Sequence, residues 1–227
     1  KSKGNVVTPM GLLEEHGSDG VRYWAASGRP GTDTAFDPGQ MKVGRRLAIK
    51  MLNAAKFALM QAEPRGAITE PLDRGMLSSL STLVRESTEQ LEAYDYARVL
   101  EHTERFFWSF CDDYLELVKG RRYGDFTREG AASANSAMLA ALSTLLRLFA
   151  PFLPFVTEEI WSWWRPGSVH NAKWPTPEEV VEPIGGHDAA AIEVFAQTRA
   201  VLGEIRRVKA LEKRPVKAII ERAILPR

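Results

Sequence analysis

Most of the sequence carries apolar residues at the spacing of an α-helix, and capping residues mark where these helices begin. Thr8-Pro9 and Asp37-Pro38 each combine an N-cap residue with proline at the first helical position. The pattern predicts helices over residues 9–17, 19–27, 38–61, 73–93, 94–119, 126–149, 158–164 and 189–213, with a bend between Pro151 and Pro154. Residues 165–186 are rich in proline and glycine, so we expect them to be irregular.

One segment near the end of the chain has a different pattern. Residues 216–220 (VKAII) resemble a short β-strand, and we interpret them as the opening of an α/β unit. The predicted fold is therefore mainly α: a helical bundle with the start of a small C-terminal α/β extension. We expect a connector over residues 1–30, the bundle over 31–165, and an irregular linker, a basic helix and the incomplete extension over 166–227.

The composition narrows the possible chemistry. Of the 227 residues 44% are apolar and 26% are charged, as in ordinary globular proteins, and the net charge of +1 excludes a uniformly basic protein. The single cysteine, Cys111, excludes an intramolecular disulfide, and four scattered histidines give no metal-binding spacing, so we expect no metal. The uncharged stretch 130–146 is rich in Ala and Ser and is closed by Arg147, so we expect no membrane span.

The charges are segregated along the chain although they nearly cancel. Residues 41–65 carry a net charge of +5, residues 73–118 of −6 and residues 199–227 of +6. A protein with this distribution can present a basic face to a polyanion such as RNA.

The first basic segment concentrates its charge on one side of a helix. At 100° per residue, one arc of about 140° holds a set that we call the basic stripe: Lys42, Arg45, Arg46, Lys50, Asn53, Lys56 and Phe57. Leu47, Met51, Ala54, Ala55 and Ala58 lie opposite and are the expected core face. The lysines and arginines could neutralise phosphates while a base stacks on Phe57, but a solvated face with a packed ring explains the same pattern.

Several motifs resemble those of class I aminoacyl-tRNA synthetases. Lys1 and Ser2, followed by KGNV, look like the end of the KMSKS signature, and residues 17–24 (GSDGVRYW) look like the stretch that follows it. Three further tracts resemble valyl-tRNA synthetases in particular: residues 31–34 (GTDT), 50–57 (KMLNAAKF) and 148–161 (LFAPFLPFVTEEIW). The chain differs from the family pattern in two places: Lys56 replaces the more common arginine, and Met51-Leu52 replaces the more common Leu-Trp. The family's residue roles are therefore assigned less firmly at these positions.

The resemblance implies the anticodon-binding bundle of an enzyme that ligates valine to its tRNA with ATP. Lys1 and Ser2 would then be the remnant of the ATP-binding signature, and the basic stripe would bind the anticodon arm. The sequence has no HIGH-type motif and no nucleotide-binding sheet, so we expect the chain alone to be inactive and to bind no cofactor. We further expect a monomeric, cytoplasmic protein without membrane contact. The alternatives are the equivalent part of an isoleucyl-tRNA synthetase and a helical scaffold that binds protein through residues 73–118.

The other candidate residues have structural interpretations that are at least as good. Asp112, Asp113 and Glu116 are interpreted as solvated acids rather than as a catalytic pair, and Cys111 as a buried apolar residue. The tryptophans at 161, 163 and 164 are more typical of packing than of base stacking. For Arg206, Arg207 and Lys209, phosphate contact and plain solvation remain equally good explanations.

Overall fold

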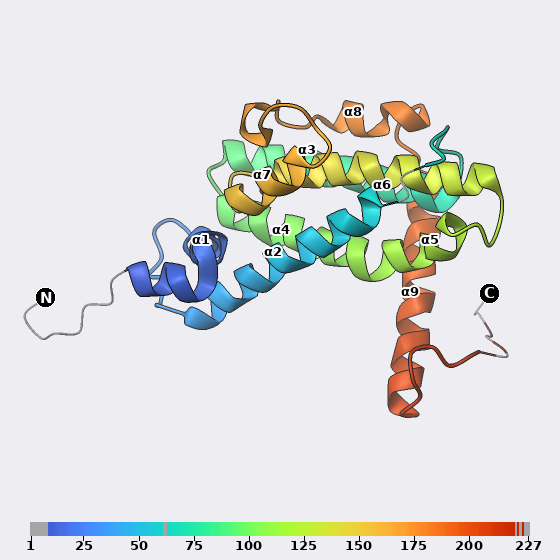
Figure 1. Ribbon diagram of the computed structural model, residues 1–227, viewed down its shortest axis with the longest axis horizontal. Helices are drawn as coiled ribbons and strands as arrows, with labels where there is room; N and C mark the ends of the chain where they lie inside the picture. Colours follow the sequence, from blue (N-terminus) through green and yellow to red (C-terminus); the bar gives the residue numbers. More distant parts are fainter. Residues whose placement is uncertain (1–8, 61–62, 221, 223, 225–227) are drawn as a thin grey trace, which may run out of the picture.

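The computed structural model describes residues 9–60, 63–220, 222 and 224, and every regular element in these residues is a helix (Figure 1). The α-helices are α1 (Pro9–Ser27), α2 (Pro38–Leu59), α3 (Pro71–Glu92), α4 (Tyr96–Ser109), α5 (Leu115–Arg122), α6 (Arg128–Phe149), α7 (Pro154–Ser162), α8 (Pro177–Val181) and α9 (Ala189–Leu211). A π-helical segment, η1 (Phe110–Tyr114), joins α4 to α5. The predicted mainly α fold is confirmed, whereas Lys1 and Ser2 lie outside the described residues.

The helix ends follow the signals in the sequence. The side chains of Asp37, Thr127 and Asp188 each accept a hydrogen bond from a backbone N–H in the first turn of the helix that follows. Gly17, with φ of 76° and ψ of 160°, breaks α1 into two short helices as predicted. In an L-residue other than glycine this positive φ would be strained.

The core is built around α6. Within the described part of the chain, α6 is the helix that has the length and mean hydropathy, 1.2, of a membrane span. Most of its residues are buried among the other helices, which is the pattern of a core helix. The tract that follows also enters the core, because Leu153, Ile160 and Trp161 are buried.

Two glycines allow α1 and α2 to approach closely. A Cβ on Gly44 would lie 2.4 Å from the Cβ of Tyr23, and a Cβ on Gly20 would lie 2.8 Å from the carbonyl oxygen of Met41. The carboxylate of Asp19 accepts two backbone N–H bonds from the first turn of α7, at 3.1 and 2.8 Å. These contacts fix α1 and α7 against the N-terminal half of α2.

A buried polar network joins four other elements of the bundle. Asp73 of α3 is fully buried and accepts hydrogen bonds from the hydroxyl of Tyr114 at 2.9 Å and that of Ser133 at 2.6 Å. The guanidinium of Arg121 binds the same carboxylate through two nitrogens, at 2.7 and 3.0 Å. This network fixes η1, α5 and α6 relative to α3.

The C-terminal part differs from the prediction. The first half of α9 packs on α3, and the second half projects from the bundle (Figure 1). The predicted strand at 216–220 is wrong: the chain turns there, with the N–H of Ala218 donating to Pro215 at 2.9 Å. Val216 and Ile219 are 80% and 93% exposed, and no strand in the described residues offers them a ladder to join. The division of the chain at residues 30 and 165 stays a prediction.

Candidate nucleic-acid interface

Helix α2 presents the basic stripe on the outer surface of the bundle. The five residues expected in the core are all buried. Of the stripe, Lys42, Arg45, Arg46, Asn53 and Lys56 are exposed, while Lys50 and Phe57 are partly buried. Because α2 contains no acidic residue, its outer face carries positive charge along its whole length. The structure therefore brings the seven predicted residues together on one face.

The cations of the stripe differ in their surroundings. Arg45 donates to the carbonyl oxygen of Glu15 in α1, at 2.6 Å, so its guanidinium is held at the junction of α1 and α2. Lys42 and Lys56 have neither a hydrogen-bond nor a charged partner among the described residues, so their ammonium groups are available to an anion.

An aromatic ring from another helix, which the sequence pattern does not indicate, lies at the centre of the stripe. The guanidinium carbon of Arg46 and the Nζ of Lys50 lie 6.0 and 5.6 Å from the ring centroid of Trp108 in α4. The indole N–H donates to Glu104 at 3.0 Å, which fixes the ring. Cations over an aromatic face are attracted by its quadrupole, so Trp108 holds both side chains near the surface of α4.

Lys50 is also bound by the first acid of η1. Its Nζ donates to Asp112 at 2.8 Å, and this hydrogen bond is the main cause that raises the pKa of Lys50 above its ordinary value. The neighbouring Asp113 binds Arg199 and Arg206 of α9. The interpretation of these two acids as simply solvated is therefore wrong, because Asp112 pairs with α2 and Asp113 with α9.

A pocket of about 280 Å³ opens between the C-terminal half of the stripe and α5. Its lining is half polar and half apolar, and consists of Lys50, Asn53, Ala54, Phe57, Cys111, Leu115, Glu116 and Lys119. The amide of Asn53 can both donate and accept a hydrogen bond, and Lys119 pairs with Glu116 at 3.7 Å. This volume lies at the small end of ligand pockets, so it suits one flat ring system better than a larger molecule.

The ring of Phe57 is fixed at the edge of this pocket. The guanidinium of Arg122 lies 4.5 Å from its centroid, and Tyr123 makes an edge contact at 6.5 Å. Arg122 is buried and also donates to the carbonyl oxygens of Phe57 and Ala58 at the end of α2, and burial lowers its pKa. The ring thus combines the packing role and the exposed position that the sequence left as alternatives.

Cys111 lines the same pocket but is itself buried. Its side chain is 5% exposed, and burial raises the pKa of the thiol to about 12. A thiol with this pKa stays protonated near neutral pH and is a poor nucleophile. The interpretation of Cys111 as a buried apolar residue is confirmed.

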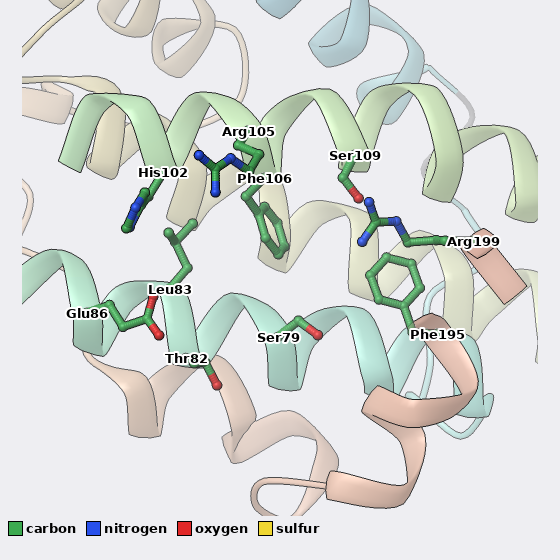
Figure 2. Close-up of a pocket in the computed structure, with 10 residues that line it drawn as sticks. All are labelled: Ser79, Thr82, Leu83, Glu86, His102, Arg105, Phe106, Ser109, Phe195 and Arg199. Carbon is green, nitrogen blue, oxygen red and sulfur yellow. The ribbon is translucent and has the colours of Figure 1, made fainter. Parts of the chain in front are cut away.

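A second pocket, of about 300 Å³, lies between α3 and α4 (Figure 2). Glu86 of α3 and His102 and Arg105 of α4 line it, and Phe195 and Arg199 of α9 close one end. It mixes acidic and basic groups, in contrast to the uniformly basic face of α2. No group of three acids, cysteines or histidines in the described residues could hold a metal ion.

The three tryptophans at the end of α7 differ in burial: Trp163 is 38% exposed and donates to Glu159 at 3.0 Å, whereas the other two pack against the bundle. Trp161 is buried, and the guanidinium of Arg165 lies 5.9 Å from its ring and 4.5 Å from that of Trp164. The burial of Trp161 agrees with the packing interpretation, and Arg165 lies against both rings.

Comparison with known proteins identifies the family. Residues 73–220 match the family described as the anticodon-binding domain of tRNA ligase. The chain is 58% identical over 228 residues to a valine–tRNA ligase of Thermobifida fusca, and 53% identical over 232 residues to one of Leifsonia xyli. These alignments cover 98% and 99% of the chain but only 25% and 26% of the relatives, so the chain spans about a quarter of their length.

A solved structure has the same fold. The LeuRS chain of the Agrobacterium radiobacter K84 agnB2 LeuRS–tRNA–LeuAMS complex matches with a TM-score of 0.60 and 21% identity, covering 79% of this chain and 22% of that one. The fold, the matched family and the relatives agree with one another, and we conclude that the chain belongs to the family of anticodon-binding domains of tRNA ligases.

Proposed function

We propose that the outer face of α2 binds the anticodon arm of a tRNA. The main support for this proposal is that two features lie on the same helix. One is a face with five cations and no acid, and the other is a pocket of about 280 Å³ at the C-terminal half of that face. The cations would supply phosphate affinity that is independent of sequence, because phosphate contacts position an RNA without specifying it.

The pocket would supply the contact with a base. RNA loops are recognised through unstacked bases that stack on aromatic side chains and hydrogen-bond along their edges. Phe57 offers a fixed ring at the pocket edge, and the amide of Asn53 offers both a donor and an acceptor. We propose that one loop base enters here, with Lys50 and Lys119 close enough to bind its flanking phosphates.

The parent protein would be a valine–tRNA ligase that uses ATP, acts in the cytoplasm and charges valine tRNAs. The relatives named above favour valine over isoleucine. In such a parent, Lys1 and Ser2 would belong to the ATP-binding signature that their sequence resembles. The 227-residue chain alone would not form aminoacyl-adenylate, since it carries only these two residues of that signature; valine-dependent pyrophosphate exchange by the purified chain would refute this.

The test is a titration of the 227-residue chain with the anticodon stem-loop of a valine tRNA at several salt concentrations. Arg46→Gln with Lys50→Gln should lower the slope of log affinity against log salt by about one unit per side chain, for any loop sequence. Asn53→Ala should instead weaken binding to the native loop more than to a scrambled loop, with little change in slope.

Two results would contradict the proposal. One is an unchanged slope and affinity in the double variant. The other is equal loss of affinity for the native and scrambled loops in Asn53→Ala, because a residue that reads a base must distinguish them. Far-ultraviolet circular dichroism of each variant controls for loss of helix.

A further inference from the structure

The second half of α9 is a long element with little packing of its own. Phe195 is buried against α3, but from residue 200 to Leu211 each residue is partly or fully exposed, and the helix projects from the bundle (Figure 1). Isolated helical segments of this length are marginal in water, so the contact at the base of the projecting half decides its direction.

The projecting half is basic on one side. With Arg206 at zero, Arg207 lies near 100° and Lys209 near 300°, so the three cations fall within an arc of about 160°. Glu204, which pairs with Arg207 at 2.7 Å, is the one acid between Arg199 and Leu211. The charge of this half therefore complements a polyanion, as that of α2 does.

The base of the projecting half is held by η1. The carboxylate of Asp113 accepts hydrogen bonds from the Nε of Arg199 at 2.9 Å and from Arg206 at 2.8 Å. Arg206 also donates to the backbone carbonyl of Asp112, whose side chain binds Lys50 of the basic stripe. Two consecutive acids thus link α9 and α2 to the same turn, and bring Arg206 and Lys50 to the two sides of η1.

We propose that the projecting half of α9 makes a second contact with the RNA backbone, continuous with the basic stripe, and that Asp113 is the residue that positions it. This inference rests on the proposed function, because it assigns the same RNA to both faces. The basic stripe would hold the loop, and Arg206, Arg207 and Lys209 would neutralise phosphates farther along the arm.

Two features favour RNA over a protein as the partner of this half: its positive charge, and its link through η1 to the basic stripe. The cations of the projecting half share one side, whereas its apolar residues lie largely on the other side: Val201, Leu202, Ile205, Val208 and Leu211. A protein bound through those apolar residues would leave the RNA affinity of this half unchanged, so the experiment below separates the two.

The first variant is Arg207→Gln with Lys209→Gln, in the full 227-residue chain. Neither residue bonds to Asp113, so the base of the helix is left intact. The slope of log affinity against log salt for the valine anticodon stem-loop should fall by about one unit per side chain. The matched control is Arg98→Gln, because Arg98 forms the same kind of i,i+3 pair, with Asp95, on α4.

The second variant, Asp113→Asn, tests positioning through the sign of its effect. If Asp113 only repelled phosphates, removing its charge would tighten RNA binding. If it positions Arg206, Asp113→Asn weakens binding and lowers the slope by about one unit despite the removal of a negative charge. Asp113→Glu, which keeps the charge, should retain most of the slope.

Each outcome decides the matter. A reduced slope in both α9 variants, with Arg98→Gln unchanged, supports the inference. An unchanged slope in Arg207→Gln/Lys209→Gln overturns it while leaving the proposed function intact, provided that the Arg46→Gln/Lys50→Gln variant still loses slope. Tighter binding by Asp113→Asn overturns the positioning role. If neither the α2 nor the α9 variant loses slope, the proposed function itself fails.

Discussion

Replacing Asp73 by alanine should destabilise the bundle strongly, because this carboxylate is buried and fully engaged. It accepts hydrogen bonds from Tyr114, Ser133 and two nitrogens of Arg121, which is itself only 12% exposed. The alanine variant would leave the guanidinium of Arg121 buried without its carboxylate, and two hydroxyl groups would lose their acceptor.

The size of the effect follows from this geometry. Removing one partner of a buried ion pair costs about 3–5 kcal/mol, because the other charge stays buried without compensation. Against a total stability of about 5–15 kcal/mol for a domain, such a loss is a large fraction. The same change would release α5, which forms one wall of the pocket beside the basic stripe.

Urea unfolding followed by circular dichroism measures this loss directly. The matched control is Glu101→Ala, which removes an exposed carboxylate paired with Arg105 at 2.9 Å. An exposed pair is worth about 0–1 kcal/mol, so the control should be close to the wild type. If Asp73→Ala costs less than about 1 kcal/mol, as the exposed pair does, the network does not hold the bundle together.

Three further predictions follow from individual packing sites. Gly44→Ala should cost about 1–3 kcal/mol, because its Cβ would meet Tyr23, whereas Gly203→Ala, with open space around it, should be neutral or slightly stabilising in the same unfolding assay. Cys111 should react with a thiol reagent at pH 8 far more slowly in the folded chain than in denaturant, because burial raises its pKa to about 12; equal rates would contradict this. Burial raises the pKa values of Tyr23 and Tyr114 in the folded state, so the unfolded chain loses its phenol protons first. The free energy of unfolding should therefore fall above about pH 10, by about 1.4 kcal/mol per pH unit for each phenol. Tyr23→Phe should make this decline with pH shallower.

The helices were predictable because their signals are local. Asp37-Pro38 marks the start of α2, and the spacing of Leu47, Met51 and Ala58 identifies its buried face. The same spacing identifies the outer face, so the seven residues of the basic stripe could be grouped before their surroundings were known.

The surroundings of the stripe could not be predicted, because they depend on which elements pack beside α2. Trp108 and Arg122 enter the site only because α4 and α5 lie against that helix. The roles of Asp112 and Asp113 in η1 have no local sequence signal either, since their partners, Lys50 and Arg206, are far away in the chain.

The strand at residues 216–220 was wrongly predicted for a related reason. A short run rich in Val and Ile forms a strand only where a neighbouring strand is available to pair with it. Residues 216 and 217 form a turn, and Lys209 of α9 donates to the carbonyl oxygen of Val216 at 2.6 Å. The local pattern of a strand is present, but the described residues contain no strand with which it could pair.

The central claim is that a loop base enters the pocket between α2 and α5, and photo-crosslinking tests it most directly. An anticodon stem-loop of valine tRNA with a photoreactive uridine in the loop would be irradiated with the 227-residue chain, and the linked peptides identified by mass spectrometry. Links are expected in the segments that line the pocket, at Asn53 and Phe57 of α2 or Leu115 and Lys119 of α5. Links confined to α3 and α8, on another side of the bundle, would contradict it.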